Sequence, residues 1–224
     1  MTAVILQARL DSSRLPEKSL LPLGNSVLLF QVMSSLKKVP CDLHILACPE
    51  DCIKIFSVLA EKCAFNIIGG SKEDVLNRYC NAIRYFKVDR LIRATGDNPF
   101  VFIDAAEEIN NEAVSLKADY AGYSALPYGA GVESVSSEAL LKAEREATLQ
   151  SEREHVCPYL YNHGEKFLLH RPLSPLKWRG ADLRITVDTR EDYERAKILH
   201  NYLEKTERKH CGENIIGAYR KLFV

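Results

Sequence analysis

The sequence predicts an α/β protein whose mostly parallel sheet is covered by helices on both faces. Over the first hundred residues, short β-branched and aliphatic runs alternate with segments whose apolar residues recur every three or four positions. Glycine, proline and polar clusters separate these segments. Such alternation is typical of βαβ units, and these units build parallel sheets.

The bulk composition is that of an ordinary globular protein with one domain. The chain has 224 residues, of which 46% are hydrophobic and 27% charged. Thirty basic residues balance thirty acidic ones, so we expect no general attraction to nucleic acid or to a membrane. No apolar run is long enough to cross a bilayer, and the N-terminal run is too short for a signal peptide. We therefore expect a cytoplasmic protein, whose seven scattered cysteines are reduced and mostly buried.

The first half of the chain predicts four strands and four helices. The helix that follows SKED has the clearest apolar spacing, and we expect Ser71 and Asp74 to form its capping box. The expected strands are residues 3–6, 43–47, 66–68 and 90–94. The expected helices are residues 27–36, 53–59, 75–86 and 103–116.

The second half alternates less regularly, and residues 120–180 are expected to form a small inserted lobe. We expect strands at 119–123, 167–171 and 183–187, a loop at 125–134, and helices at 137–147 and 214–222. A capping box at Ser151 would begin another helix, which Pro158 would kink or end. Thr189 and Asp192 would cap a long helix near the C-terminus.

Three cations occupy the loop after the first predicted strand. Arg9, Arg14 and Lys18 stand in a segment that has no glycine before Gly24, so side chains rather than a glycine-rich backbone would bind an anion. Forked guanidinium groups and a mobile ammonium suit phosphate oxygens. The alternative is a solvated loop whose cations pair with nearby carboxylates. The P-loop pattern and a dinucleotide-binding glycine motif after the first strand are both absent.

Two aspartates follow predicted strands, Asp97 after RLIRA and Asp188 after LRITV. Each alone has a structural explanation as a turn or helix-capping residue. If both lie at one edge of the sheet, a magnesium ion would relieve their repulsion and bridge them to phosphate oxygens. The sequence therefore suggests a magnesium–nucleotide site at the carboxyl ends of the strands.

The N-terminal motif ARLDSSRLPEKSLLPLG resembles that of cytidylyltransferases that activate acidic sugars, the 3-deoxy-manno-octulosonate and acylneuraminate enzymes. The similarity is greatest to the spore-coat polysaccharide SpsF branch. The supporting stretches are GSKEDVLNRY, RATGDNPF, GAGVESVSSEAL with SEREHVCPYLY, and LRITVDTREDYERA, which span nearly the whole chain. The resemblance implies a Rossmann-like fold of the nucleotide-diphospho-sugar transferase type, dependence on Mg²⁺, and usually a homodimer formed through the middle lobe. It also implies transfer of CMP from CTP to a sugar hydroxyl.

The resemblance also assigns roles to residues of this chain. It implies catalytic roles for Arg14, Lys18 and Asp97, with Asp97 and Asp188 on the metal. The residues that it implies at the nucleotide are Leu6, Ala8, Arg9, Ser71, Asp74 and Thr95. Those that it implies at the acceptor are Glu133, Arg153, Glu154 and His155.

Several alternatives stay open. Thr95 stands where the octulosonate enzymes have glutamine, and threonine makes fewer hydrogen bonds, so the preference for cytosine is less secure. The REHV segment has a second interpretation as a helix with a solvated charged face. Rival functions are a glycosyltransferase of similar fold, although no DxD motif is present in a suitable loop, and a non-catalytic nucleotide-binding protein. The alternative residues for an acceptor carboxylate are His170, Arg171, Lys177 and Arg179.

Overall fold

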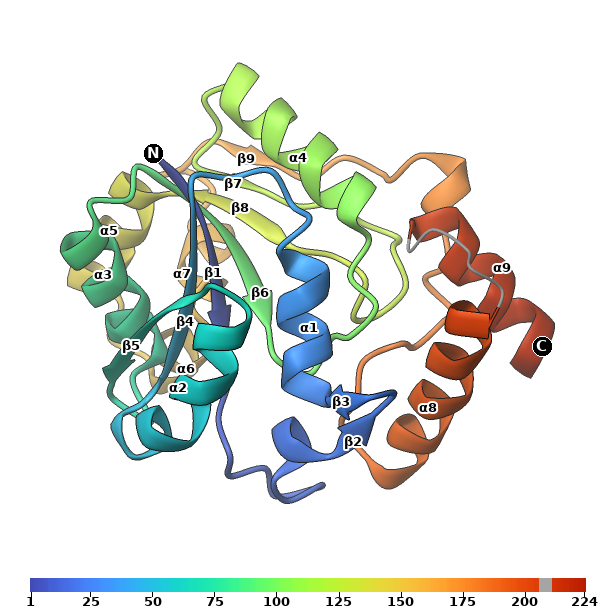
Figure 1. Cartoon of the computed structure of the whole chain (residues 1–224). Helices are drawn as coiled ribbons and strands as arrows, with labels where there is room; N and C mark the ends of the chain where they lie inside the picture. Colours follow the sequence, from blue (N-terminus) through green and yellow to red (C-terminus); the bar gives the residue numbers. More distant parts are fainter. Residues whose placement is uncertain (206–210) are drawn as a thin grey trace.

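The computed structural model describes residues 1–205 and 211–224, and it confirms the mostly parallel sheet with helices on both faces (Figure 1). The sheet has seven strands in the order β5-β4-β1-β6-β8-β7-β9. Only β8 runs antiparallel to its neighbours, β6 and β7. The strands are β1 (Thr2–Gln7), β4 (Leu43–Pro49), β5 (Asn66–Gly70), β6 (Arg90–Thr95), β7 (Tyr120–Ala121), β8 (Glu133–Ser136) and β9 (Leu169–His170).

The helices pack against the sheet in two groups, and each group forms its own core. Along β1 the side chains alternate: Val4 and Leu6 enter one core, whereas Ala3 and Ile5 enter the other. The first core includes residues of α1 (Leu28–Leu36), α2 (Ile53–Lys62), α4 (Ile103–Ser115), α8 (Arg190–Lys205) and α9 (Gly212–Phe223). The second includes residues of α3 (Val75–Phe86), α5 (Ser137–Glu146) and α7 (Pro158–Asn162), and α6 (Gln150–His155) contacts α3.

Short elements complete the chain. A separate ribbon of β2 (Pro22–Leu23) and β3 (Ser26–Val27) precedes α1. Three 3₁₀ turns are η1 (Lys18–Leu20), η2 (Glu50–Cys52) and η3 (Leu176–Trp178). None of the described helices is both long and apolar enough to span a membrane.

Two predictions of strand and loop were wrong. The segment 125–134, expected as a loop, ends in strand β8, whose Val135 is fully buried and pairs with Leu91 of β6. Polar residues surround that valine, so the short strand lacks a clear alternating pattern. Conversely, the apolar segment 183–187 is extended but pairs mainly with loops: Ile185 donates to Tyr128 O at 2.9 Å and Val187 to Asp97 O at 2.8 Å.

The helix caps differ from expectation at two of three places. Helix α3 has Asp74 itself as its N-cap, with Asn77 N donating to its carboxylate at 2.9 Å, and Ser71 only supports Asp74. Helix α6 begins at Gln150, before Ser151, and has no side-chain cap. The capping box at Thr189 and Asp192 is confirmed, since each side chain accepts a hydrogen bond from the other's backbone N–H.

The segment around Pro158 agrees with the sequence, because α6 ends at His155 and Pro158 occupies the first turn of α7. Residues 120–180, expected as an inserted lobe, supply β7, β8 and β9 to the large sheet. They also carry α5 and α6, which pack beside α3, and α7, which packs against α5 and α6. Their expected roles in acceptor binding and dimer formation stay predictions.

Candidate active site

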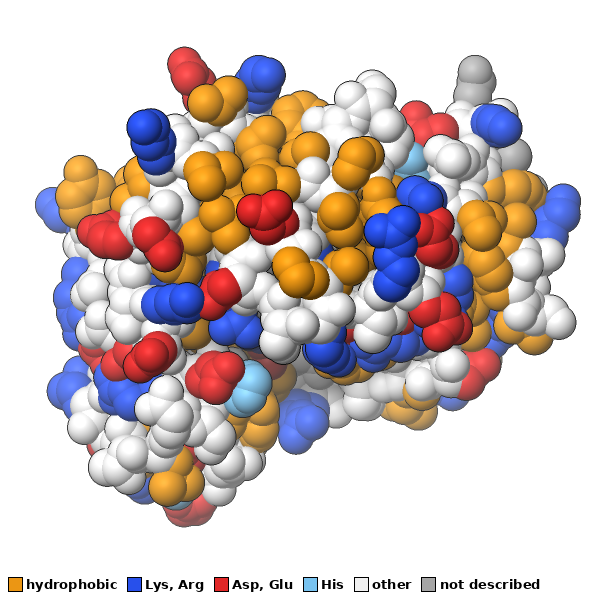
Figure 2. Space-filling view, turned by 90° about the horizontal axis from the view of Figure 1, so that it is seen from below, with side chains coloured by type: hydrophobic (Ala, Val, Ile, Leu, Met, Phe, Trp, Pro, Cys, Tyr) orange, Lys and Arg blue, Asp and Glu red, His pale blue; other side chains and the backbone are white. Residues whose placement is uncertain are grey.

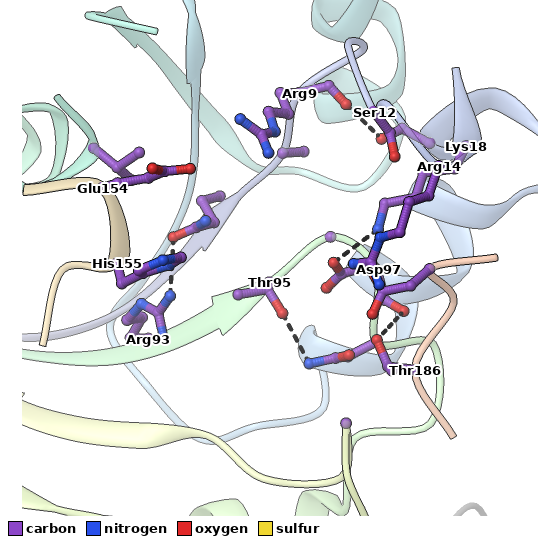
Figure 3. A pocket seen from close by; sticks show the side chains of 18 of the residues that line it. Arg9, Ser12, Arg14, Lys18, Arg93, Thr95, Asp97, Glu154, His155 and Thr186 are labelled. Atoms are coloured by element: carbon purple, nitrogen blue, oxygen red, sulfur yellow. Dashed lines mark hydrogen bonds and ion pairs between the residues drawn. The ribbon is translucent and has the colours of Figure 1, made fainter. Parts of the chain in front are cut away.

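A cavity of about 430 Å³ lies at the carboxyl ends of β1 and β6 (Figure 3). The loop that follows β1, the N-terminal part of α3, the end of α6 and the segment before α8 complete its wall. Nine residues singled out from the sequence line it: Ala8, Arg9, Arg14, Lys18, Thr95, Asp97, Glu154, His155 and Asp188. Parts of the chain far apart in sequence therefore form one site, as expected where parallel strands end.

Lys18 joins the two aspartates on which the magnesium hypothesis depends. Its ammonium lies 2.9 Å from Asp97 Oδ2 and 2.9 Å from Asp188 Oδ1, and it also donates to Val187 O at 2.9 Å. The two carboxylate oxygens can therefore be no farther apart than twice that distance. The prediction that Asp97 and Asp188 project toward the cationic loop is confirmed.

Asp188 is held by cations on both of its oxygens. Arg14 Nη2 lies 3.2 Å from Oδ1, and Arg184 Nη2 lies 2.6 Å from Oδ2. Burial alone would raise the pKa of Asp188, but the bonds and charges of Lys18 and Arg14 outweigh it and lower that pKa. The carboxylate is therefore ionised at neutral pH, as a metal ligand must be.

The donor set suits a magnesium ion that shares its coordination with a ligand. Within residues 1–205 and 211–224, no three His, Cys, Asp or Glu side chains are grouped to hold a metal by themselves. Magnesium commonly takes one or two carboxylates and completes its octahedron with water and phosphate oxygens. Asp97 and Asp188 fit that pattern, with the Lys18 ammonium lying between them.

The alternative of a solvated cationic loop is not what the structure shows. Arg14 and Lys18 pair with the distant aspartates, whereas Asp11 of the same loop pairs with Lys72 at 2.6 Å. Figure 3 shows Arg9 on the wall opposite His155, and its guanidinium forms no ion pair within the described part of the chain. Two cations of this loop are thus fixed at the carboxylate end of the cavity.

Five residues named from the sequence lie outside the cavity lining. Leu6 is fully buried in the core, and Ser71 supports the N-cap of α3. Arg153 donates from Nε to Asp74 Oδ2 at 2.7 Å and from Nη1 to two backbone carbonyls at 3.0 Å, so both side chains join α3 to α6. The implied ligand contacts of these residues stay predictions.

The fifth residue, Glu133, belongs to a buried network under the cavity floor. Its carboxylate pairs with Arg93 and accepts a hydrogen bond from the Tyr120 hydroxyl at 2.8 Å. Burial opposes the charge of Arg93, but Glu133 outweighs it and raises the pKa of that guanidinium. Arg93 also donates to Gln7 Oε1 at 3.2 Å, and both Arg93 and Gln7 line the cavity.

The four alternative cations for an acceptor carboxylate all lie away from the cavity lining. His170 bonds Glu112 at 2.6 Å, and Arg179 donates to Ser174 O at 2.8 Å. Arg171 and Lys177 stack over the rings of Tyr161 and Trp178.

Several lining residues were not singled out as site residues from the sequence: Gln7, Arg78, Arg93, Asn98, Tyr128 and Thr186. Arg93 had a signal that would have found it, because a charge in the middle of a buried strand needs a partner or a ligand. Asn98 donates to Thr95 Oγ1 at 2.8 Å, which occupies one acceptor site of the Thr95 hydroxyl and leaves its O–H to donate.

The fold is that of nucleotidyltransferases, and comparison with known proteins is more specific. Residues 3–215 match the model of the cytidylyltransferase family, so the chain belongs to that family. It is 32% identical over 203 residues to the spore coat polysaccharide biosynthesis protein SpsF of Bacillus subtilis, covering 88% of this chain and 85% of that protein. The resemblance inferred from the sequence motifs is thereby confirmed.

Two solved structures are similar to this chain. A cytidylyltransferase from Leptospira borgpetersenii superposes with a TM-score of 0.88 at 25% identity, covering 98% of this chain and 94% of that one. A CMP-2-keto-3-deoxy-manno-octonic acid synthetase in complex with CTP superposes with a TM-score of 0.69 at 15% identity, covering 90% and 98%. At that identity the second likeness concerns the fold alone.

Proposed function

We propose that this protein transfers CMP from CTP to a hydroxyl group of a sugar, with release of pyrophosphate, for the synthesis of a surface polysaccharide or glycoconjugate. The observation that carries the proposal is the cluster of Lys18, Asp97 and Asp188 beside the loop of Arg9 and Arg14. It offers cations for a triphosphate and carboxylates for Mg²⁺ in one cavity. Membership of the cytidylyltransferase family and the similarity to SpsF support CTP and a sugar as substrates.

The residues have distinct tasks in the proposed reaction. The sugar oxygen attacks the α-phosphorus in line, the bond from that phosphorus to the leaving oxygen breaks and its electron pair stays on pyrophosphate, and the hydroxyl proton passes to solvent water. Arg14 and Lys18 stabilise the negative charge that grows on pyrophosphate. Asp97 and Asp188 would hold Mg²⁺, which neutralises phosphate charge when bound. Glu154 and His155, at the end of α6, line the side of the cavity where we place the acceptor.

A pyrophosphate-release assay with CTP, Mg²⁺ and a panel of acidic sugars tests the proposal. Asp97→Asn should reduce turnover at least about a hundredfold, because it removes a metal ligand at the reacting phosphate. The matched control is Asp182→Asn, an exposed aspartate outside the cavity lining, which should leave the rate unchanged. Near-normal pyrophosphate release by Asp97→Asn would refute the metal role.

The same assay separates the rival functions. A glycosyltransferase releases no pyrophosphate, and a non-catalytic binding protein would gain thermal stability from CTP without releasing pyrophosphate with any acceptor. The cytoplasmic location and the homodimer implied by the resemblance also stay proposals. Light scattering tests the dimer, since a solution mass equal to the chain's 25.3 kDa would contradict it.

A further inference from the structure

Arg78 is a buried cation that has no carboxylate partner among the described residues. The residue is 2% exposed, and its Nη1 donates to Ser71 O at 2.7 Å. Its Nε is shielded from solvent and has no hydrogen-bond acceptor. A buried charge left in this state costs free energy, so its presence calls for an explanation.

Arg78 lines the end of the cavity at which no described carboxylate pairs with the positive charges of Arg9 and Arg78. Burial lowers the pKa of Arg78, and the nearby charge of Arg9 adds to that effect. Neither cation forms an ion pair within the described ranges. At the other end, Arg14 and Lys18 are already paired with Asp97 and Asp188.

The order of the strands separates the two ends of the cavity, with Asp97 at one end and Arg78 at the other. Asp97 follows β6, whereas Arg78 lies on α3, which follows β5; β4 and β1 stand between these two strands. A nucleotide whose phosphates reach Asp97 and Lys18 therefore extends across the end of β1 toward α3. There Val75, one turn before Arg78 on α3, lines the cavity, and its aliphatic side chain suits the flat face of a base.

We propose that the Arg78 guanidinium recognises the pyrimidine base of the nucleotide by donating hydrogen bonds to O2 and N3 of cytosine. This inference rests on the proposed function and names a residue that determines which nucleotide is used. Both cytosine atoms are acceptors, whereas uracil carries a hydrogen on N3 that would face another donor. Arginine reads adjacent acceptors on guanine by the same geometry. Such a contact would supply hydrogen bonds to the base that a single Thr95 hydroxyl cannot provide.

Calorimetric titration with CTP, UTP and inorganic tripolyphosphate, each with Mg²⁺, tests the inference. The wild-type protein should bind CTP at least about tenfold more tightly than UTP, because an unmatched buried donor penalises the wrong base. Arg78→Met should lose at least about tenfold in CTP affinity and most of the preference over UTP, yet keep its affinity for tripolyphosphate. The matched control is Arg84→Met, a more exposed arginine of the same helix, which should bind all three ligands like the wild type.

Each other outcome has a definite meaning. Equal loss of CTP and tripolyphosphate affinity in Arg78→Met would show a phosphate contact and overturn base recognition. Wild-type binding of CTP and UTP with equal affinity would overturn it too, while nucleotide binding would stand. Failure of the wild type to bind CTP would instead refute the proposed function itself.

Stability provides a second readout. Since Arg78 is buried without a carboxylate partner among the described residues, the ligand-free Arg78→Met protein should melt no lower than the wild type. If it melts much lower with unchanged CTP affinity, Arg78 is structural and the inference fails. Should Arg78→Met not fold, Arg78→Lys is the second variant. It keeps the positive charge but loses the paired N–H donors of the guanidinium, so the preference for CTP over UTP should still fall. An unchanged preference in that variant would also overturn the inference.

Discussion

Lys18 belongs to the N-terminal sequence motif, but its side-chain contacts depend on the tertiary structure. It lies in the loop after β1, yet its three hydrogen-bond acceptors belong to residues 97, 187 and 188. A cation between two carboxylates relieves their repulsion, which is the task proposed for Mg²⁺ once a nucleotide engages Lys18. In the structure the two carboxylates share the ammonium of Lys18 as their common cation.

Removing the ammonium group of Lys18 should make the thermal stability of the protein depend more strongly on Mg²⁺. We expect Lys18→Met to lose roughly 1–3 kcal/mol of stability at pH 7 and to gain more thermal stabilisation from Mg²⁺ alone than the wild type does. The loss should shrink in acid. Because the pKa of Asp188 is lowered on folding, its ionised form stabilises the protein above about pH 4, and this contribution falls as the carboxylate is protonated.

Thermal melts with and without Mg²⁺ at pH 7 and pH 3 measure this effect. Lys38→Met, an exposed lysine outside the cavity lining, is the control and should melt like the wild type at both pH values. If Mg²⁺ stabilises Lys18→Met no more than the wild type, Asp97 and Asp188 do not form a cation site.

At the scale of elements, hydrogen bonds from the Arg153 side chain attach helix α6 to α3. Arg153 of α6 bonds Asp74, the N-cap of α3, and also the carbonyl oxygens of Glu144 and Ala147. The N-cap thus serves the helix start and the helix–helix contact at once. Since Glu154 and His155 directly follow Arg153, these hydrogen bonds also determine where the two lining residues lie.

We expect Arg153→Met to reduce stability by about 2 kcal/mol, because it leaves Asp74 and two carbonyl groups without their partner. Denaturant unfolding measures the loss. Asp74→Asn should share part of it, so that a double-mutant cycle gives a coupling energy above about 0.5 kcal/mol. The control is Arg145→Met, an exposed arginine of α5. A variant at Arg153 that keeps full stability but shows a higher KM for the acceptor would favour the acceptor role implied by the resemblance.

At the scale of the whole molecule, the cavity is lined by residues from position 7 to position 188, and the face at the carboxyl end of β1 carries mixed charges (Figure 2). Figure 2, which views the end toward which β1 runs in Figure 1, shows basic and acidic side chains interspersed with apolar ones. This agrees with the equal numbers of basic and acidic residues, and the described residues on this face form no broad basic surface that would attract anions (Figure 2).

The seven cysteines give a test of the intact fold. Five are buried, and only Cys41 and Cys211 are partly exposed. Burial raises the pKa of Cys48 to about 12, so its thiolate is scarce at neutral pH. With an aromatic disulfide reagent at pH 8, we expect at most these two thiols to react quickly in the native protein and all seven after denaturation. Rapid reaction of Cys157, which is 1% exposed, would show that α6 and α7 open readily.

The sequence alone determined the βαβ order, the two core faces and the family, because these depend on local periodicity and on motifs that lie within single segments. It also identified the cationic loop and both aspartates. It did not identify β8, since four residues with one clearly buried valine have no readable period. Arg78 was missed because its spacing matches that of a helix residue. That it is buried without a carboxylate partner among the described residues is visible only in the tertiary structure.

Only the tertiary structure decided which charges meet. Arg14 and Lys18 could have paired within their own loop, but burial of both cores brings residues 97 and 188 to the same edge, where Coulomb attraction across a few ångströms is strongest. Likewise Arg153, which sequence motifs assign to the acceptor, lies on Asp74 because α6 packs beside the start of α3. Spacing along the chain limits which residues can share a helix face or a loop. It cannot specify contacts between segments that only packing brings together.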